Sequence, residues 1–117
     1  MLIERCEIHA THLPLKEPFV ISYETYNHMP SVIVKLIADN GLVGYGEAVP
    51  DEHVTGESFY STISGNPSAK AAIDIACYDL MGKYTKLPIY DLLGGKFHES
   101  LSFAKVLSID DDLWAGF

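Results

Sequence analysis

The chain has 117 residues, which is room for a single domain with one modest core. Hydrophobic residues make up 48% and charged residues 21% of the sequence, a balance typical of a globular protein that excludes intrinsic disorder. The 16 acidic side chains outnumber the 8 basic ones and give a formal net charge of -8, which argues against a nucleic acid as partner because phosphate binding needs clustered Lys and Arg.

The chain opens with a segment that alternates with a period of two. Within residues 2–13, Cys6, Ile8 and Ala10 point to one face, and charged or polar residues point to the other. This pattern predicts a half-buried β-strand.

A polar segment follows this strand. Pro14 and Pro18 bracket its start, and proline donates no hydrogen bond to a β-ladder. Residues 19–30 (FVISYETYNHMP) mix polar and aromatic side chains without clear periodicity. We therefore expect a long, ordered loop over 19–30.

Two β-prone runs complete the first half of the chain. Residues 31–38 (SVIVKLIA) and 42–48 (LVGYGEA) flank Asn40 and Gly41, a pair that tolerates positive φ at both positions. Asn-Gly between such runs predicts a hairpin, so the chain should begin with a three-stranded antiparallel meander.

The second half of the chain predicts helices. Residues 49–66 are rich in Pro, Gly, Ser and Thr and predict a loop. Asn66 and Pro67 then have the residue types of an N-cap and a first helical position. The helix that follows carries an apolar stripe at helical spacing, made of Ala69, Ala72, Ile73, Ala76, Cys77 and Leu80.

Gly82 and Pro88 bound the other end of this helix. Residues 92–95 (LLGG) close a short second turn, and residues 101–109 (LSFAKVLSI) predict one more strand. Together these elements predict an α+β fold, in which a three-stranded antiparallel meander is followed by helices.

No spacing in the chain indicates a catalytic or metal site. The five histidines lack metal-ligand spacing. Gly44 and Gly46 form a G-x-G inside a strand with no helix after it, which favours close backbone approach over dinucleotide binding. Asp74 and Asp79 lie about 140° apart around a helix, which excludes a carboxylate dyad and favours structural roles such as an interface hydrogen bond.

The two cysteines, Cys6 and Cys77, indicate neither a disulfide framework nor a metal site, which makes a reducing cytoplasm the expected location. Charged side chains interrupt residues 1–20, so no signal peptide is expected there. No stretch approaches the ~18 unbroken apolar residues of a membrane span, and we expect no membrane partner.

A longer pattern lies over the predicted helices. The segment AKAAIDIACYDLMGKYTKLPIYDLLG, residues 69–94, resembles the N-terminal signature of the mandelate racemase and muconate-lactonizing enzymes of the enolase superfamily. Cys77 departs from this signature, in which Ala or Leu is usual. The positions that agree are Ala69, Ala71, Ala72, Asp74, Ala76, Asp79, Gly82, Lys83, Pro88, Leu92, Leu93 and Gly94.

The N-terminal half carries an independent resemblance. Residues 18–19 (PF), 31–36 (SVIVKL), 44–48 (GYGEA) and 54–58 (VTGES) are most similar to the dipeptide epimerases of that superfamily. The resemblance implies a capping domain with three antiparallel strands followed by helices, which is the architecture that periodicity predicts.

Two features depart from the family pattern. Only six residues (FYSTIS) join Ser58 to Gly65, too few for the helical hairpin that family members carry there. A (β/α)8 barrel, about 200 or more residues, should follow the capping domain. The resemblance therefore implies a capping domain over 1–98 with a shortened helical hairpin, and a stub of the first barrel strand over 99–117, with the barrel itself absent.

The resemblance also implies where the chemistry of the family lies. The catalytic lysines and the three carboxylate Mg2+ ligands of the family lie on barrel strands beyond Phe117, so we expect no catalytic residue, no metal ligand and no cofactor in this chain. In the full-length family, racemisation proceeds by α-proton abstraction through an Mg2+-stabilised enediolate. The resemblance implies a truncated substrate-specificity domain that is inactive alone and whose parent enzyme is a dipeptide epimerase.

The family's capping domain closes over the barrel mouth with two loops that select a small, dipeptide-like substrate. These loops correspond to residues 18–30 and 50–57 of this chain. A carboxylate at Glu24 repels acidic substrate side chains and favours neutral or basic ones. By position, the predicted substrate-binding residues are Phe19, Glu24, Tyr26, His53, Val54 and Thr55.

Two alternatives stay open at this point. Within the family, the parent enzyme is a muconate cycloisomerase or an o-succinylbenzoate synthase, which the loop residues 18–30 would distinguish. Outside it, the chain is a non-catalytic binding or assembly module that keeps the fold. We also expect a homo-oligomer, formed through the exposed barrel-facing surface and residues 101–117.

Overall fold

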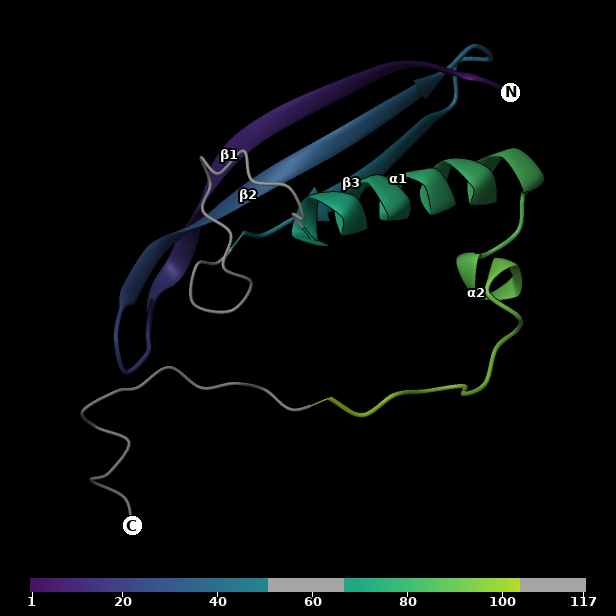
Figure 1. Cartoon of the computed structure of the whole chain (residues 1–117). Helices are drawn as coiled ribbons and strands as arrows, with labels where there is room; N and C mark the ends of the chain where they lie inside the picture. The colour runs from purple at the N-terminus through teal and green to yellow at the C-terminus, as the bar shows by residue number, and fades with distance from the viewer. Residues whose placement is uncertain (51–66, 104–117) are drawn as a thin grey trace.

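A computed structural model describes residues 1–50 and 67–103 of the chain. They form β1 (Ile3–Val20), β2 (Thr25–Ala38), β3 (Val43–Ala48), α1 (Pro67–Thr85) and α2 (Ile89–Leu92). The strands make one antiparallel sheet in the order β1-β2-β3. α1 lies along one face of this sheet, and α2 packs near the C-terminal end of α1 (Figure 1). The predicted α+β fold, a meander followed by helices, is confirmed.

The first hairpin is longer than the sequence pattern predicts. β1 and β2 stay paired as far as Val20, which lies opposite Thr25. Most of the segment 19–30 is therefore strand, and the prediction of a long loop there is wrong. Polar and aromatic side chains without a clear period conceal this strand, because both of its faces are largely open to solvent at this end.

The two prolines of β1 are accommodated by an irregularity in the pairing. Pro14 lies opposite His28 and Phe19 lies opposite Tyr26, so β1 advances from 14 to 19 while β2 advances only from 26 to 28. The extra residues of β1 bulge out of the ladder, which is where a strand tolerates proline.

The turn between β2 and β3 has three residues rather than two. The Ala38 N–H donates to the Leu42 carbonyl at 2.9 Å, and the Gly41 N–H donates to the Ala38 carbonyl at 2.9 Å. Gly41 has a φ of 81°, whereas Asn40 does not enter the left-handed region. The predicted Asn-Gly hairpin is confirmed, but its form is a three-residue loop closed by a left-handed glycine.

The core lies between α1 and the part of the sheet face that β2 and β3 build. Small residues let the helix approach closely, because a Cβ at Gly46 would lie 1.8 Å from the Ala72 carbonyl oxygen and one at Gly44 would lie 2.2 Å from that of Ala76. The interpretation of the G-x-G as a close backbone approach is confirmed. The buried apolar residues are Val34, Leu36, Ala38, Ala48, Ala72, Ala76 and Leu80.

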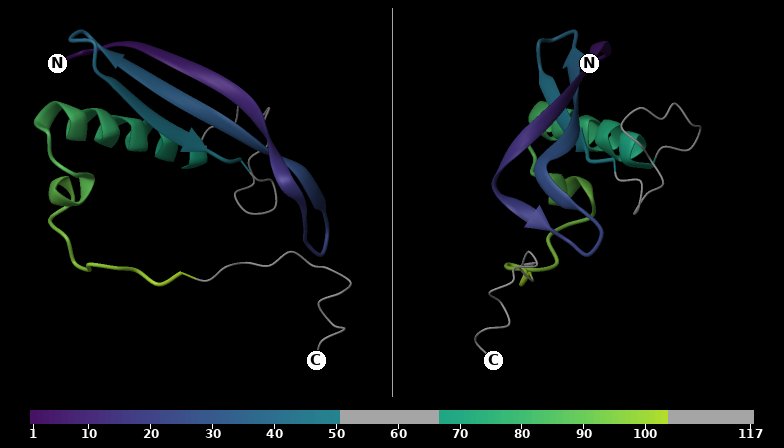
Figure 2. Two further views of the ribbon diagram at one scale, coloured as in Figure 1. Left: turned by 180° about the vertical axis from the view of Figure 1, so that it is seen from behind. Right: turned by 90° about the vertical axis from the view of Figure 1, so that its left-hand side faces the viewer.

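The corresponding face of β1 has no cover among the described elements. Cys6 lies opposite Leu36 and Ile8 opposite Val34, so these β1 side chains share the face on which α1 packs. α1 contacts β2 and β3 but not β1 (Figure 2). Ile8 of β1 is 69% exposed. The predicted alternation is confirmed, but the expectation of a half-buried strand is wrong. A period of two shows which side chains share a face, and not whether another element covers that face.

The helices follow their sequence signals closely. α1 begins at Pro67 as predicted and ends at Thr85, between the two predicted stop residues, and α2 is the predicted short second turn. Three predicted features lie outside the described residues. They are the N-cap Asn66, the shortened hairpin between Ser58 and Gly65, and residues 104–109 of the predicted last strand. Residues 101–103 have no regular secondary structure. The boundary between 1–98 and 99–117 stays a prediction.

Candidate functional site

The free end of the β1–β2 hairpin brings together three of the six predicted substrate-binding residues. Phe19 and Tyr26 lie directly opposite each other, and both are partly buried. Glu24 is exposed in the turn, where its carbonyl accepts a hydrogen bond of 2.9 Å from the Ile21 N–H. The hairpin end therefore combines one exposed carboxylate with a cross-strand pair of aromatic residues.

The other three predicted residues cannot be placed beside them. His53, Val54 and Thr55 lie outside the described residues, so their part in the site stays a prediction.

A hollow of about 530 Å3 opens beside the bulge of β1. Phe19 is the only predicted site residue in its wall, and the sequence pattern did not single out the others. The lining residues are Leu15, Lys16, Glu17, Phe19 and Met29. The only sequence signal for these lining residues is the pair of prolines around residues 15–17. Such prolines indicate a bulge, but they do not indicate that the bulge creates a hollow.

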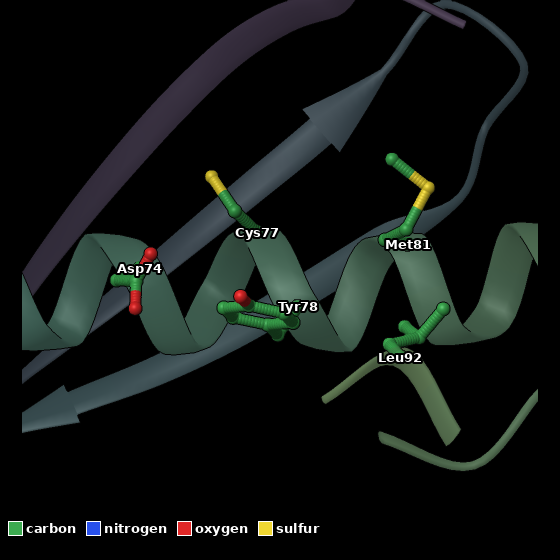
Figure 3. Close-up of a pocket in the computed structure, with 5 residues that line it drawn as sticks. All are labelled: Asp74, Cys77, Tyr78, Met81 and Leu92. Carbon is green, nitrogen blue, oxygen red and sulfur yellow. The ribbon is translucent and has the colours of Figure 1, made fainter. Parts of the chain in front are cut away.

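A second hollow, of about 370 Å3, lies between α1 and α2. Asp74, Cys77, Tyr78 and Met81 line it from α1, and Leu92 reaches it from α2 (Figure 3). Its polar groups are the Asp74 carboxylate, the Cys77 thiol and the Tyr78 hydroxyl.

Two side chains of α1, Asp79 and Lys83, join the helix to the outer edge of β3 by hydrogen bonds to its backbone. The Asp79 carboxylate accepts hydrogen bonds from the Tyr45 N–H at 2.8 Å and from Lys83 Nζ at 2.7 Å. Lys83 Nζ also donates to the Val43 carbonyl at 2.8 Å and lies 5.4 Å from the centroid of the Tyr45 ring. The predicted structural role of Asp79, an interface hydrogen bond, is confirmed.

The environment of Asp79 changes its acidity. Burial raises the pKa of this carboxyl, but the hydrogen bonds from Lys83 and the Tyr45 N–H, with the positive charge of Lys83, lower the pKa further than burial raises it. Asp79 therefore stays ionised to a lower pH than an isolated aspartate.

The opposite face of the sheet carries an ion network. Glu7 lies 2.9 Å from Lys35, 3.0 Å from Arg5 and 3.6 Å from His9. The hydrogen bond from Lys35 is the main cause of a lowered pKa at Glu7. Within residues 1–50 and 67–103, no group of three or more His, Cys, Asp or Glu side chains could hold a metal ion. Neither described helix is long and apolar enough to cross a membrane.

Comparison with known proteins identifies relatives of the whole described fold. Residues 51–94 match the N-terminal domain of the mandelate racemase / muconate lactonizing enzyme family. The chain is 45% identical to the N-succinyl-L-Arg/Lys racemase of Bacillus cereus, over 95% of this chain and 38% of the racemase. The crystal structure of the B. cereus racemase superposes with a TM-score of 0.87.

Two epimerases are also similar. The hydrophobic dipeptide epimerase of Enterococcus faecalis is 37% identical over 81% of this chain and 35% of its own length. The dipeptide epimerase of Methylococcus capsulatus, crystallised with Mg and L-Arg-D-Lys, superposes with a TM-score of 0.83 at 26% identity, over 94% of this chain and 39% of that one. The chain thus spans less than two fifths of the length of these relatives.

The alignments also reveal an internal difference in length. The alignment with the racemase runs over 141 positions, whereas 95% of 117 residues is about 111 residues. The racemase therefore carries about 30 residues, within the aligned region, that have no counterpart here. A difference of this size agrees with the shortened helical hairpin expected from the sequence.

Proposed function

Because the chain belongs to the N-terminal capping domains of the mandelate racemase and muconate-lactonizing group of the enolase superfamily, we propose that it selects the substrate of a racemase or epimerase whose substrate carries a basic or neutral side chain. The hairpin end with Phe19, Glu24 and Tyr26 is the proposed selecting surface.

The position of Glu24 is the observation that carries this proposal. Glu24 is exposed in the turn, two residues before Tyr26, which pairs with Phe19 across the hairpin. Aromatic side chains at this end can offer an apolar surface to the stem of a Lys or Arg side chain. An exposed carboxylate attracts a cationic substrate group and repels an anionic one. The names of the relatives support this preference, since the B. cereus enzyme is an N-succinyl-L-Arg/Lys racemase and another relative is an L-Lys-D/L-Arg epimerase.

The proposed role is selection rather than chemistry. Crystal structures of the E. faecalis and M. capsulatus epimerases contain Mg, but the described residues of this chain include no cluster of ligands that fits the ion. The described residues supply a sheet, with α1 packed on it, that positions the hairpin end.

The proposal can be tested in a chimera in which this chain replaces the corresponding N-terminal part of the B. cereus racemase. The measurement is kcat/KM for N-succinyl-L-lysine and for the neutral N-succinyl-L-norleucine. We expect Glu24→Gln to lower the preference for lysine about 5-fold, the effect of about 1 kcal/mol from one exposed charge pair. Glu24→Lys should reverse the sign of the interaction and lower the preference further.

A matched control removes a carboxylate far from the hairpin end. Glu4→Gln, on an exposed part of β1, should leave the preference unchanged. An unchanged preference in Glu24→Gln would contradict the proposed role of Glu24. A folded chimera without racemase activity would favour the alternative of a non-catalytic binding module.

A further inference from the structure

The two edge strands of the sheet, β1 and β3, differ in how the described elements cover their outer backbone groups. On the outer edge of β3, the Tyr45 N–H donates to Asp79 and the Val43 carbonyl accepts from Lys83, so α1 satisfies backbone groups that would otherwise face another strand. A capped edge of this kind does not pair with a further strand.

The outer edge of β1 has no such cap among the described elements. β1 contacts β2 and no other described strand or helix. Between Arg5 and Leu13 it contains neither proline nor lysine, two residues with which proteins protect an edge. The irregularities in its pairing with β2 lie outside this run, between Ile3 and Arg5 and between Pro14 and Phe19. An unprotected run of strand therefore faces outward beside β2.

The side chains on this run are suited to pairing with an identical strand. Ile8, in the middle of the run, is 69% exposed, and its neighbours on the same face, Cys6 and Ala10, are exposed as well. In an antiparallel pair centred on Ile8, each Glu7 lies opposite a His9 and each Arg5 opposite a Thr11, so no like charges face each other. A pair centred on Glu7 would instead set two carboxylates against each other.

We infer that a second copy of this chain binds here, through antiparallel β1–β1 pairing about a twofold axis at Ile8, and extends the sheet across the two copies. This contact differs from the one expected through residues 101–117, most of which lie outside the described residues. It uses only backbone groups and side chains of β1.

The first test is the oligomeric state of the full 117-residue chain, measured by sedimentation equilibrium up to roughly 100 µM. We expect a dimer. Ile8→Lys places two cations opposite each other on the axis and should raise the dissociation constant at least about 10-fold. The matched control Ile73→Lys makes the same change on α1, where the side chain is 48% exposed, and should leave the dimer unchanged.

A monomeric wild-type chain would overturn the inference, and so would an Ile8→Lys variant whose dissociation constant is unchanged. Loss of the dimer in a chain truncated after Ser100 would also overturn it, because that result places the contact in the C-terminal segment. Circular dichroism of each variant separates loss of pairing from loss of folding.

Disulfide trapping tests the register independently of stability. In a Cys6→Ala, Cys77→Ala background, Ile8→Cys should oxidise to a covalent dimer, because residues facing each other across a strand pair have Cα atoms within disulfide range. The single variant Cys77→Ala, which keeps Cys6, should not form one. A covalent dimer through Cys6 alone would overturn the register centred on Ile8.

Discussion

Asp79 shows how a single charged residue joins a helix to a sheet. It is the group on α1 that accepts a backbone N–H from β3, and it also holds Lys83, which reaches a carbonyl of the same strand. The side chain is only 29% exposed, so water screens this ion pair less than it screens a fully exposed one. The contact therefore contributes both stability and orientation.

The lowered pKa of Asp79 predicts a pH dependence. A carboxyl whose pKa is lower in the folded chain than in the unfolded one stabilises the fold above the unfolded pKa, and this stabilisation is lost as the pH falls through the folded pKa. At pH 7 we expect Asp79→Asn to reduce the free energy of unfolding by about 1 kcal/mol. The difference from wild type should shrink below about pH 4, where the unfolded carboxyl is protonated.

Urea unfolding between pH 7 and pH 3 measures this difference. Asp74→Asn provides the control, because it removes the same charge from an exposed position on the same helix. The explanation fails if the two variants lose equal stability at pH 7, or if the Asp79→Asn deficit persists unchanged at pH 3.

At the scale of the elements, α1 and β3 pack closely because two residues of β3 have no side chain. Gly44 and Gly46 leave room for the carbonyl oxygens of Ala76 and Ala72, so the helix lies directly on the strand. This fit explains why the strand needs glycine although glycine lowers β-propensity.

Gly46→Ala should therefore be severely destabilising. A methyl group 1.8 Å from the Ala72 carbonyl oxygen forces the helix away from the strand, at a cost of at least about 3 kcal/mol in the free energy of unfolding. Gly41→Ala is the contrasting variant, because its Cβ meets nothing within 4 Å and only the positive φ opposes it. It should cost about 1 kcal/mol. Equal losses in the two variants, measured by thermal unfolding, would contradict the packing explanation.

Much of this arrangement of elements could be predicted from the sequence. The strong β-propensity of β2 and the Asn-Gly turn are local signals that the structure confirms. The predicted apolar stripe of α1 is confirmed at Ala72, Ala76 and Leu80, which are buried, but it is wrong at Ala69 and Ile73, which are exposed because no described element packs on that side of the helix. The extension of β1 beyond Pro14 could not be predicted, because a bulge lets proline remain in a strand and no periodicity survives it.

The candidate site was predictable only in part. Phe19, Glu24 and Tyr26 were found through resemblance, and the pairing of Phe19 with Tyr26 depends on a register that a bulge offsets. The hollow beside Lys16 arises from that same offset. Local patterns in a sequence do not encode such offsets, because they are set by how two strands align.

At the scale of the whole molecule, the apolar face of β1 has a counterpart in the length difference between this chain and its relatives. Within the aligned region, the B. cereus racemase carries about 30 residues that have no counterpart in this chain. No described element covers the apolar face of β1. We expect the additional residues of the relatives to pack on this face, since an exposed apolar face on a sheet normally receives a helix.

Restoring those residues tests this explanation. Inserting the corresponding segment of the racemase between Ser58 and Gly65 should raise Tm by at least about 5 °C, because even ~100 Å2 of newly buried apolar surface is worth about 2.5 kcal/mol. In a Cys77→Ala background, the insertion should also slow the reaction of Cys6 with a thiol reagent at least 10-fold, since accessibility limits that reaction. A Gly-Ser insertion of equal length is the control and should do neither.

The cap that α1 places on β3 has a consequence for the size of any assembly. A sheet with two open edges can add copies at both ends and grow into a fibre, which is the usual hazard of strand pairing. Here Asp79 and Lys83 close one edge, so a copy that pairs through β1 has no second edge to offer. The twofold contact uses the open edge of both partners at once, and growth therefore terminates at two chains.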